Sequence, residues 1–175
     1  ETKPGTKATM TTPPFLGSRA RMESGTLRGT SVRARAASGV AGRANANVSL
    51  AAQGNFVEAV WSGAAPGGAT DIFSATSRDG GKTFSAPVRV NSKVGDARVN
   101  GEQPPRVALR ARSGASPEVA VVWTTKGASG TVLLSATSVD GGRTFAASSV
   151  VPGSDAPGNR GWEGLGVGPD GRFLS

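Results

Sequence analysis

Apolar residues along this chain gather in short runs that alternate with polar positions or are bounded by turns rich in glycine, proline and serine. Runs of this kind, with valine, phenylalanine and tryptophan prominent, are typical of β-strands. The pattern predicts strands near 46–51, 56–62, 71–77, 87–91, 106–111, 118–124, 131–138 and 147–152. We therefore expect two similar groups of four short antiparallel strands.

The second group repeats the first. The phrase Ser-Arg-Asp-Gly-Gly-Lys-Thr-Phe at 77–84 returns as Ser-Val-Asp-Gly-Gly-Arg-Thr-Phe at 138–145. The strand at 57–61 likewise matches the strand at 119–123, and each ends in tryptophan. A third copy begins at 163–167 and runs through the turn at 169–171 into 172–174. Such repetition indicates one structural unit used several times.

A four-stranded sheet repeated at this spacing is typical of a propeller blade. The sequence thus predicts an all-β fold, a β-propeller of four-stranded antiparallel blades near 44–91, 104–152 and 163–175, the last incomplete. About two and a half blades cannot close a ring, because each blade has two apolar faces that need neighbours. We therefore interpret the chain as part of a longer protein.

The repeated phrase has the chemistry of a tight turn between the third and fourth strands. Its aspartate can accept hydrogen bonds from backbone N–H groups of the same turn, and its glycines can adopt positive φ. The repetition argues for a structural role, since active sites are rarely copied once per blade. The residues assigned this role are Ser77, Asp79, Gly81, Thr83 and Phe84, with Ser138, Asp140, Gly142, Thr144 and Phe145 in the second copy.

The phrase Ser-x-Asp-x-Gly-x-Thr-Phe resembles the Asp box, or bacterial neuraminidase repeat, of the sialidase superfamily. The resemblance covers roughly residues 44–175. It implies a six-bladed propeller in the full-length protein, an exo-α-sialidase-like glycoside hydrolase activity, and a secreted, periplasmic or cell-surface location. The alternative is a non-catalytic Asp-box propeller that binds a glycan or a protein.

Candidate ligand-binding residues lie in the long polar connections between blades, 92–105 and 153–162. In an up-and-down sheet these connections lie on the face opposite the Asp boxes and lead to the innermost strands. Arginine suits bidentate recognition of a carboxylate such as that of a sialic acid, glutamate can bind sugar hydroxyls, and tryptophan can stack on a sugar ring. The candidates are Glu102, Arg106, Arg160, Trp162 and Glu163. Their alternative role is to tie one blade to the next.

Catalysis is the open question. The resemblance implies an arginine triad, a tyrosine nucleophile assisted by a glutamate, and an aspartate acid/base, yet the chain has no tyrosine, no histidine and no Arg-Ile-Pro motif. No catalytic residue can therefore be assigned, and we expect residues 1–175 alone to be inactive. Glu102 and Glu163 are an alternative carboxylate pair, whose separation would decide between retaining and inverting hydrolysis.

Composition narrows the remaining possibilities. The chain lacks cysteine, and its Asp and Glu residues are dispersed, so we expect no disulfide, metal site or cofactor. No apolar run is long enough for a transmembrane helix. Most of the net charge of +8 lies in residues 1–43, a basic, low-complexity leader that we expect to be disordered. It lacks the features of a nucleic-acid-binding module, so the expected partner is a glycan or another extracellular ligand, with the oligomeric state open.

Overall fold

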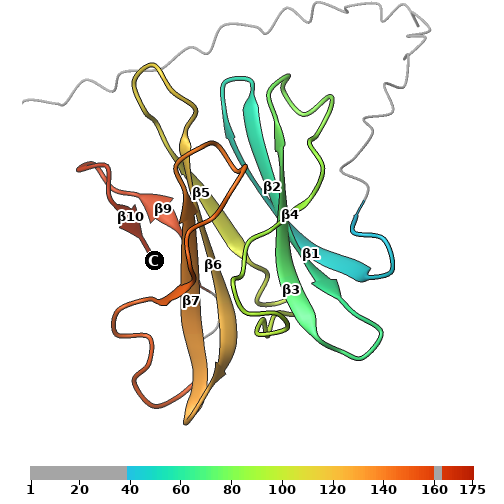
Figure 1. The fold of residues 1–175 in the computed structure, drawn as a ribbon. Helices are drawn as coiled ribbons and strands as arrows, with labels where there is room; N and C mark the ends of the chain where they lie inside the picture. The colour runs from blue at the N-terminus through green and yellow to red at the C-terminus, as the bar shows by residue number, and fades with distance from the viewer. Residues whose placement is uncertain (1–38, 160–162) are drawn as a thin grey trace, which may run out of the picture. The chain divides into compact units, whose positions relative to one another are not determined.

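The computed structural model describes residues 39–159 and 163–175. This part of the chain is all-β: it forms two four-stranded antiparallel sheets and a two-stranded antiparallel sheet, with no helix (Figure 1). Two of the candidate residues, Arg160 and Trp162, lie outside the described residues, as do positions 1–38 of the predicted leader.

Within each sheet, the strands follow one another in sequence order, so every neighbouring pair is joined directly by a turn or loop. The first sheet contains β1 (Ala44–Gln53), β2 (Phe56–Ala64), β3 (Thr70–Ser77) and β4 (Val88–Arg89). The second contains β5 (Arg106–Arg110), β6 (Glu118–Gly127), β7 (Gly130–Ser138) and β8 (Ser149–Val150). The two-stranded sheet pairs β9 (Gly166–Val167) with β10 (Phe173–Leu174). The expected grouping of the strands is therefore confirmed.

The fourth strand of each sheet is shorter than the sequence predicts. Beyond β4, the Asn91 side chain continues the pairing with β3, because its Oδ1 accepts a hydrogen bond from the backbone N–H of Ile72 at 2.8 Å. Beyond β8, Ser154 Oγ lies 3.2 Å from both the backbone N and the backbone O of Leu133. A side chain thus replaces the backbone at equivalent places in both sheets.

The main core lies between the two four-stranded sheets. Alternation along β2 and β3 directs Phe56, Val60 and Ile72 toward the second sheet, where Val121 and the fully buried Trp123 meet them. Trp61, the counterpart of Trp123, lies on the other face of the first sheet, beside Phe73 with the ring centroids 6.3 Å apart. Trp61 and Trp123 thus lie on the same face of their own sheets. In the second sheet this face packs against the first sheet, and in the first sheet it faces away from the second.

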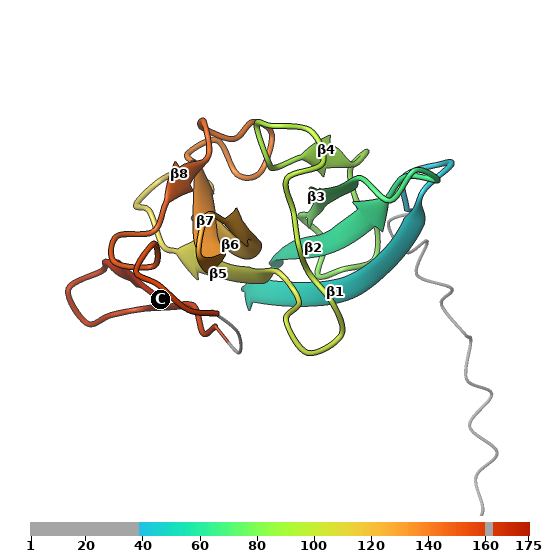
Figure 2. The same ribbon diagram turned by 90° about the horizontal axis from the view of Figure 1, so that it is seen from below.

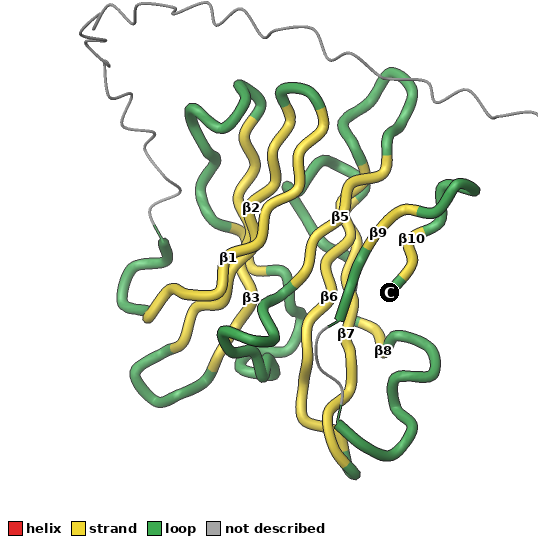
Figure 3. The backbone as a smooth tube through the Cα atoms, turned by 180° about the vertical axis from the view of Figure 1, so that it is seen from behind, coloured by secondary structure: helices red, strands yellow, loops and turns green. Residues whose placement is uncertain are grey.

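The first strands of the sheets are neighbours of one another. β5 packs beside β1, and β9 packs beside β5 (Figure 3). Viewed from below, β4 and β8 lie on the side away from β1 and β5 (Figure 2). The first strand of each sheet therefore lies beside the first strand of the next sheet.

Folded structure begins before the predicted end of the leader. Residues 39–43 form a turn held by Asn45, whose side chain bonds to the backbone N and O of Val40 and accepts the indole N–H of Trp61 at 2.9 Å. Arg43 reaches Asp71 at 2.8 Å and lies over the Phe73 ring. The expectation of disorder is wrong for these residues, because their polar groups find partners on the first sheet.

Candidate functional site

The turns at 77–84 and 138–145, named Asp-box turns after the motif that they resemble, have the same hydrogen-bonding pattern. In the first, Ser77 Oγ donates to Asp79 Oδ1 at 2.7 Å, and Thr83 donates through its backbone N at 2.9 Å and its hydroxyl at 2.6 Å. In the second, Ser138 and Thr144 make the equivalent bonds to Asp140 at 2.7, 3.0 and 2.6 Å. Each aspartate is thus the acceptor that holds the turn between the third and fourth strands.

These bonds favour the ionised aspartates. Hydrogen bonds from Thr83 and Ser77 hold the pKa of Asp79 well below its usual range. Burial raises the pKa of Asp140, but hydrogen bonds from Thr144 and Ser138 outweigh it and lower that pKa to about 2. Both carboxylates are occupied by their own turns, which leaves them poorly suited to bind a ligand.

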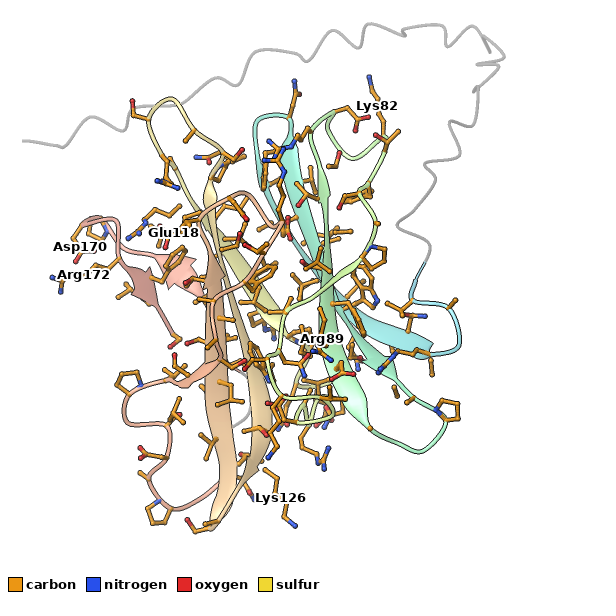
Figure 4. All side chains as sticks on the ribbon, in the orientation of Figure 1. Lys82, Arg89, Glu118, Lys126, Asp170 and Arg172 are labelled. Atoms are coloured by element: carbon orange, nitrogen blue, oxygen red, sulfur yellow. The ribbon has the colours of Figure 1, made fainter. Side chains whose placement is uncertain are left out.

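The Asp boxes and the long connections lie at opposite ends of the sheets, as the topology predicts. The Gly80 N–H donates to the Asn55 carbonyl, so the first Asp box lies beside the turn between β1 and β2. Ala97 of the first connection pairs with Thr125 near the far end of β6. Figure 4 shows Lys82, in the first Asp box, at one end and Lys126, at the end of β6, at the other.

Arg106 and Glu163 meet at the boundary between the second sheet and the segment leading to β9. Arg106 Nε donates to the backbone O of Glu163 at 3.0 Å. Glu163 is 8% exposed, and neither of its carboxylate oxygens has a hydrogen-bond partner. The Arg106 guanidinium and the Glu163 carboxylate form no salt bridge with each other.

Arg106 lies deeper than the sequence predicts. It is opposite Val122, in the middle of β6, because residues 97–98 occupy the far half of that strand before β5 begins. Glu102 differs: it is exposed on the connection, and its N–H donates to Asn100 Oδ1 at 2.8 Å. The described contacts therefore bring together Arg106 and Glu163 and leave Glu102 apart, while Arg160 and Trp162 lie outside the described residues.

A buried polar cluster, which the sequence reasoning missed, fixes the start of the first connection. Asp71 Oδ1 accepts hydrogen bonds from Asn91 Nδ2 at 2.8 Å and from the Gly95 N–H at 2.7 Å. Asn91 Nδ2 also donates to Asp96 Oδ1 at 3.0 Å. Burial raises the pKa of Asp71, but the bonds from Asn91 and Gly95 together with Arg43 outweigh it, and the pKa falls below its usual value.

Glu58 was also missed. Its side chain is fully buried between the sheets, where Oε2 accepts the Thr76 hydroxyl at 2.7 Å and Oε1 has no partner. Burial raises its pKa from 4.5 to about 7, against weaker opposing effects from Thr76, Ser74 and Arg78. In the sequence, the one indication of this site is that the first copy of the repeat has Glu58 where the second copy has Ala120.

The backbone of the second Asp box lies close to the Glu58 side chain at Gly142. Gly142 has φ of +80°, and a Cβ there would come within 2.8 Å of both carboxylate oxygens and 2.5 Å of Thr76 Oγ1. Gly81, its counterpart in the first box, has φ of +87° but nothing within 4 Å. The second glycine is therefore required for space as well as for backbone conformation.

In residues 39–159 and 163–175, no group of three or more Asp or Glu side chains is placed to hold a metal ion. The same ranges contain no helix that is long and apolar enough to cross a membrane. Comparisons with protein-family models, with curated proteins and with solved structures each found no match to this chain.

Proposed function

We propose that the chain is part of a sialidase-like β-propeller whose sheets are successive blades. The identical Asp-box turns, the alignment of β1, β5 and β9, and the equal orientation of the Trp61 and Trp123 faces support this proposal. In such an arrangement the first strand of each sheet is the innermost strand. Arg106, at the start of β5, would then face the central channel.

The function that fits this geometry best is the binding of an acidic glycan along the inner strands. The observation that carries it is the contact between Arg106 Nε and the backbone O of Glu163, a buried residue whose two carboxylate oxygens lack partners. A buried, unsatisfied carboxylate is costly unless donors reach it, and sugar hydroxyls are suitable donors. Arg106 still has two terminal nitrogens that can hold a ligand carboxylate in bidentate fashion.

Hydrolysis is the alternative, and it has weaker support. The chain has neither tyrosine nor histidine, and the carboxylate pair considered from the sequence consists of an exposed residue, Glu102, and a buried one, Glu163. Release of a fluorogenic aglycone from a sialoside by the purified chain would favour hydrolysis. We expect no release, together with measurable binding of the intact sugar.

The binding proposal can be tested by titrating the protein with a sialylated, a uronic-acid-containing and a neutral oligosaccharide. We expect the acidic sugars to bind and the Arg106→Gln variant to lose about tenfold or more in affinity, since a charge-assisted hydrogen bond contributes roughly 1.5–3 kcal/mol. Arg106→Lys should recover only part of the loss, because lysine lacks the planar fork. Arg89→Gln, an exposed position on β4, is the control. Equal affinity for acidic and neutral sugars would rule out this role for Arg106.

A further inference from the structure

A pocket lies at the Asp-box end, between the two sheets. Thr83 and Phe84 of the first box form one wall, and Gly142 and Arg143 of the second box form another. Arg78, which follows β3, also lines the pocket. The pocket is thus built from both copies of the repeat and from neither alone.

The pocket carries positive charge that nearby acids do not neutralise. Neither Arg78 nor Arg143 has a salt bridge to any described acidic residue. Arg78 is held in place by neutral groups, since Nη1 donates to Ser116 Oγ at 2.8 Å and the guanidinium lies over the Phe56 ring. The adjacent Asp79 and Asp140 are occupied by their own turns. Two arginines therefore line one pocket with their charge available.

A buried carboxyl group, that of Glu58, lies beneath the pocket. Glu58 contacts Thr76 and Gly142, both of which line the pocket, and its unpartnered Oε1 is fully buried there. Because burial raises the pKa of Glu58 to about 7, the group is mostly neutral in mildly acidic solution. The two arginines then have no buried negative charge beside them, and a bound anion can supply the negative charge that balances them.

We propose that this pocket binds a tetrahedral oxyanion, a sulfate or phosphate group carried on a larger ligand, through Arg78 and Arg143. Arginine presents a rigid fork of donors that matches two oxygens of such a group. The Phe84 ring, half-buried in the wall, can contact the carbon skeleton that bears the anion. The site is separate from Arg106 and Glu163, so either can exist without the other.

The repeat provides a matched pair of variants for the test. Lys82 and Arg143 occupy the same position in the two Asp boxes and are both exposed, but only Arg143 lines the pocket. Inorganic sulfate would be titrated at constant ionic strength and followed by backbone amide shifts. We expect saturable shifts at Gly141 and Gly142, and a loss of affinity of about tenfold in Arg143→Gln, as for other charge-assisted hydrogen bonds. Lys82→Gln should change affinity less than about twofold, since an exposed distant charge is screened.

The pH dependence of sulfate affinity distinguishes a specific site from non-specific electrostatic attraction. Sulfate keeps its charge between about pH 5 and 8, so a loss of affinity as pH rises must come from ionisation of a group on the protein. Glu58, with a pKa of about 7, ionises in that range. Arg78, which follows β3, is the charged group that acts on Glu58, and Asp140 of the second box, with a pKa of about 2, stays ionised throughout. Glu58→Gln should abolish the pH dependence and keep the binding.

Two outcomes would overturn the proposal: no saturable sulfate binding, or equal losses in Arg143→Gln and Lys82→Gln. The amide spectrum of each variant checks that it is folded, and Arg143→Lys, which keeps the charge, should retain an intermediate affinity. Parallel titrations with glucose 6-sulfate and glucose 6-phosphate would identify the natural class of ligand by the tighter binder.

Discussion

At the scale of single residues, Glu58 has the environment that least suits its type. A carboxyl group is fully buried between two sheets, with one hydroxyl donor for its two oxygens. Desolvation favours the neutral acid, so the folded chain holds its proton more tightly than the unfolded chain does. The packing of the second Asp box against the first sheet is therefore coupled to the protonation of this one residue.

This coupling predicts a pH-dependent stability. With a pKa of about 7 in the folded chain against 4.5 as the ordinary value, Glu58 makes the protein less stable as pH rises through that interval. The full cost above about pH 7 is on the order of 3 kcal/mol, at 1.36 kcal/mol per pKa unit. Glu58→Gln should therefore be more stable than the wild type at pH 8 and similar to it at pH 4.

Denaturant unfolding between these two pH values measures the effect. Glu102→Gln, which replaces an exposed carboxyl, is the control and should follow the wild-type pH profile. If the Glu58→Gln and wild-type curves stay parallel across the range, Glu58 does not carry a raised pKa.

At the scale of elements, the sequence was informative where alternation and turn chemistry act locally. The long strands β2, β3, β6 and β7 lie where the apolar pattern places them. The ends of β4 and β8 could not be foreseen, because Asn91 and Ser154 use side chains in place of the backbone. The folded turn at 39–43 was missed because its partners, Trp61 and Asp71, are distant in sequence.

The candidate site was predicted less well than the strands. Arg106 and Glu163 were selected by residue type at blade connections, and they do contact each other. Glu102 was selected on the same grounds but is exposed, because a connection can direct one polar side chain inward and another outward. Glu58 was overlooked because burial of a charged residue inside an apolar strand depends on tertiary packing.

The turn at 39–43 can be tested as an element. Arg43→Gln should lower the free energy of unfolding by about 2–4 kcal/mol, since it leaves the fully buried Asp71 carboxylate without its cation. Arg172→Gln removes the cation of the exposed pair with Asp170, labelled in Figure 4, and should cost less than about 0.5 kcal/mol. Thermal or denaturant unfolding of the two variants measures both values. Equal effects would show that the turn does not stabilise the first sheet.

At the scale of residues 39–159 and 163–175, one unit is used repeatedly with the same orientation. The second sheet turns its tryptophan face to the first, and Arg110 of β5 holds the third by donating to the Gly171 carbonyl at 3.1 Å and lying over Phe173. Repetition creates two kinds of location that a single sheet lacks: the row of first strands β1, β5 and β9, and the gap between the two Asp-box turns. The two proposed sites occupy one of each.

The packing of the two equivalent four-stranded sheets against each other can be tested directly with an engineered disulfide. Ser92, after β4, and Ser148, before β8, are 56 positions apart but have their hydroxyls 3.1 Å from each other. The chain has no cysteine of its own, so Ser92→Cys with Ser148→Cys introduces the sole thiol pair. We expect complete oxidation under mild conditions and a gain of about 2–4 kcal/mol in stability. Oxidation no faster than in a control pair, Ser92→Cys with Ser129→Cys, would contradict the packing of the two sheets.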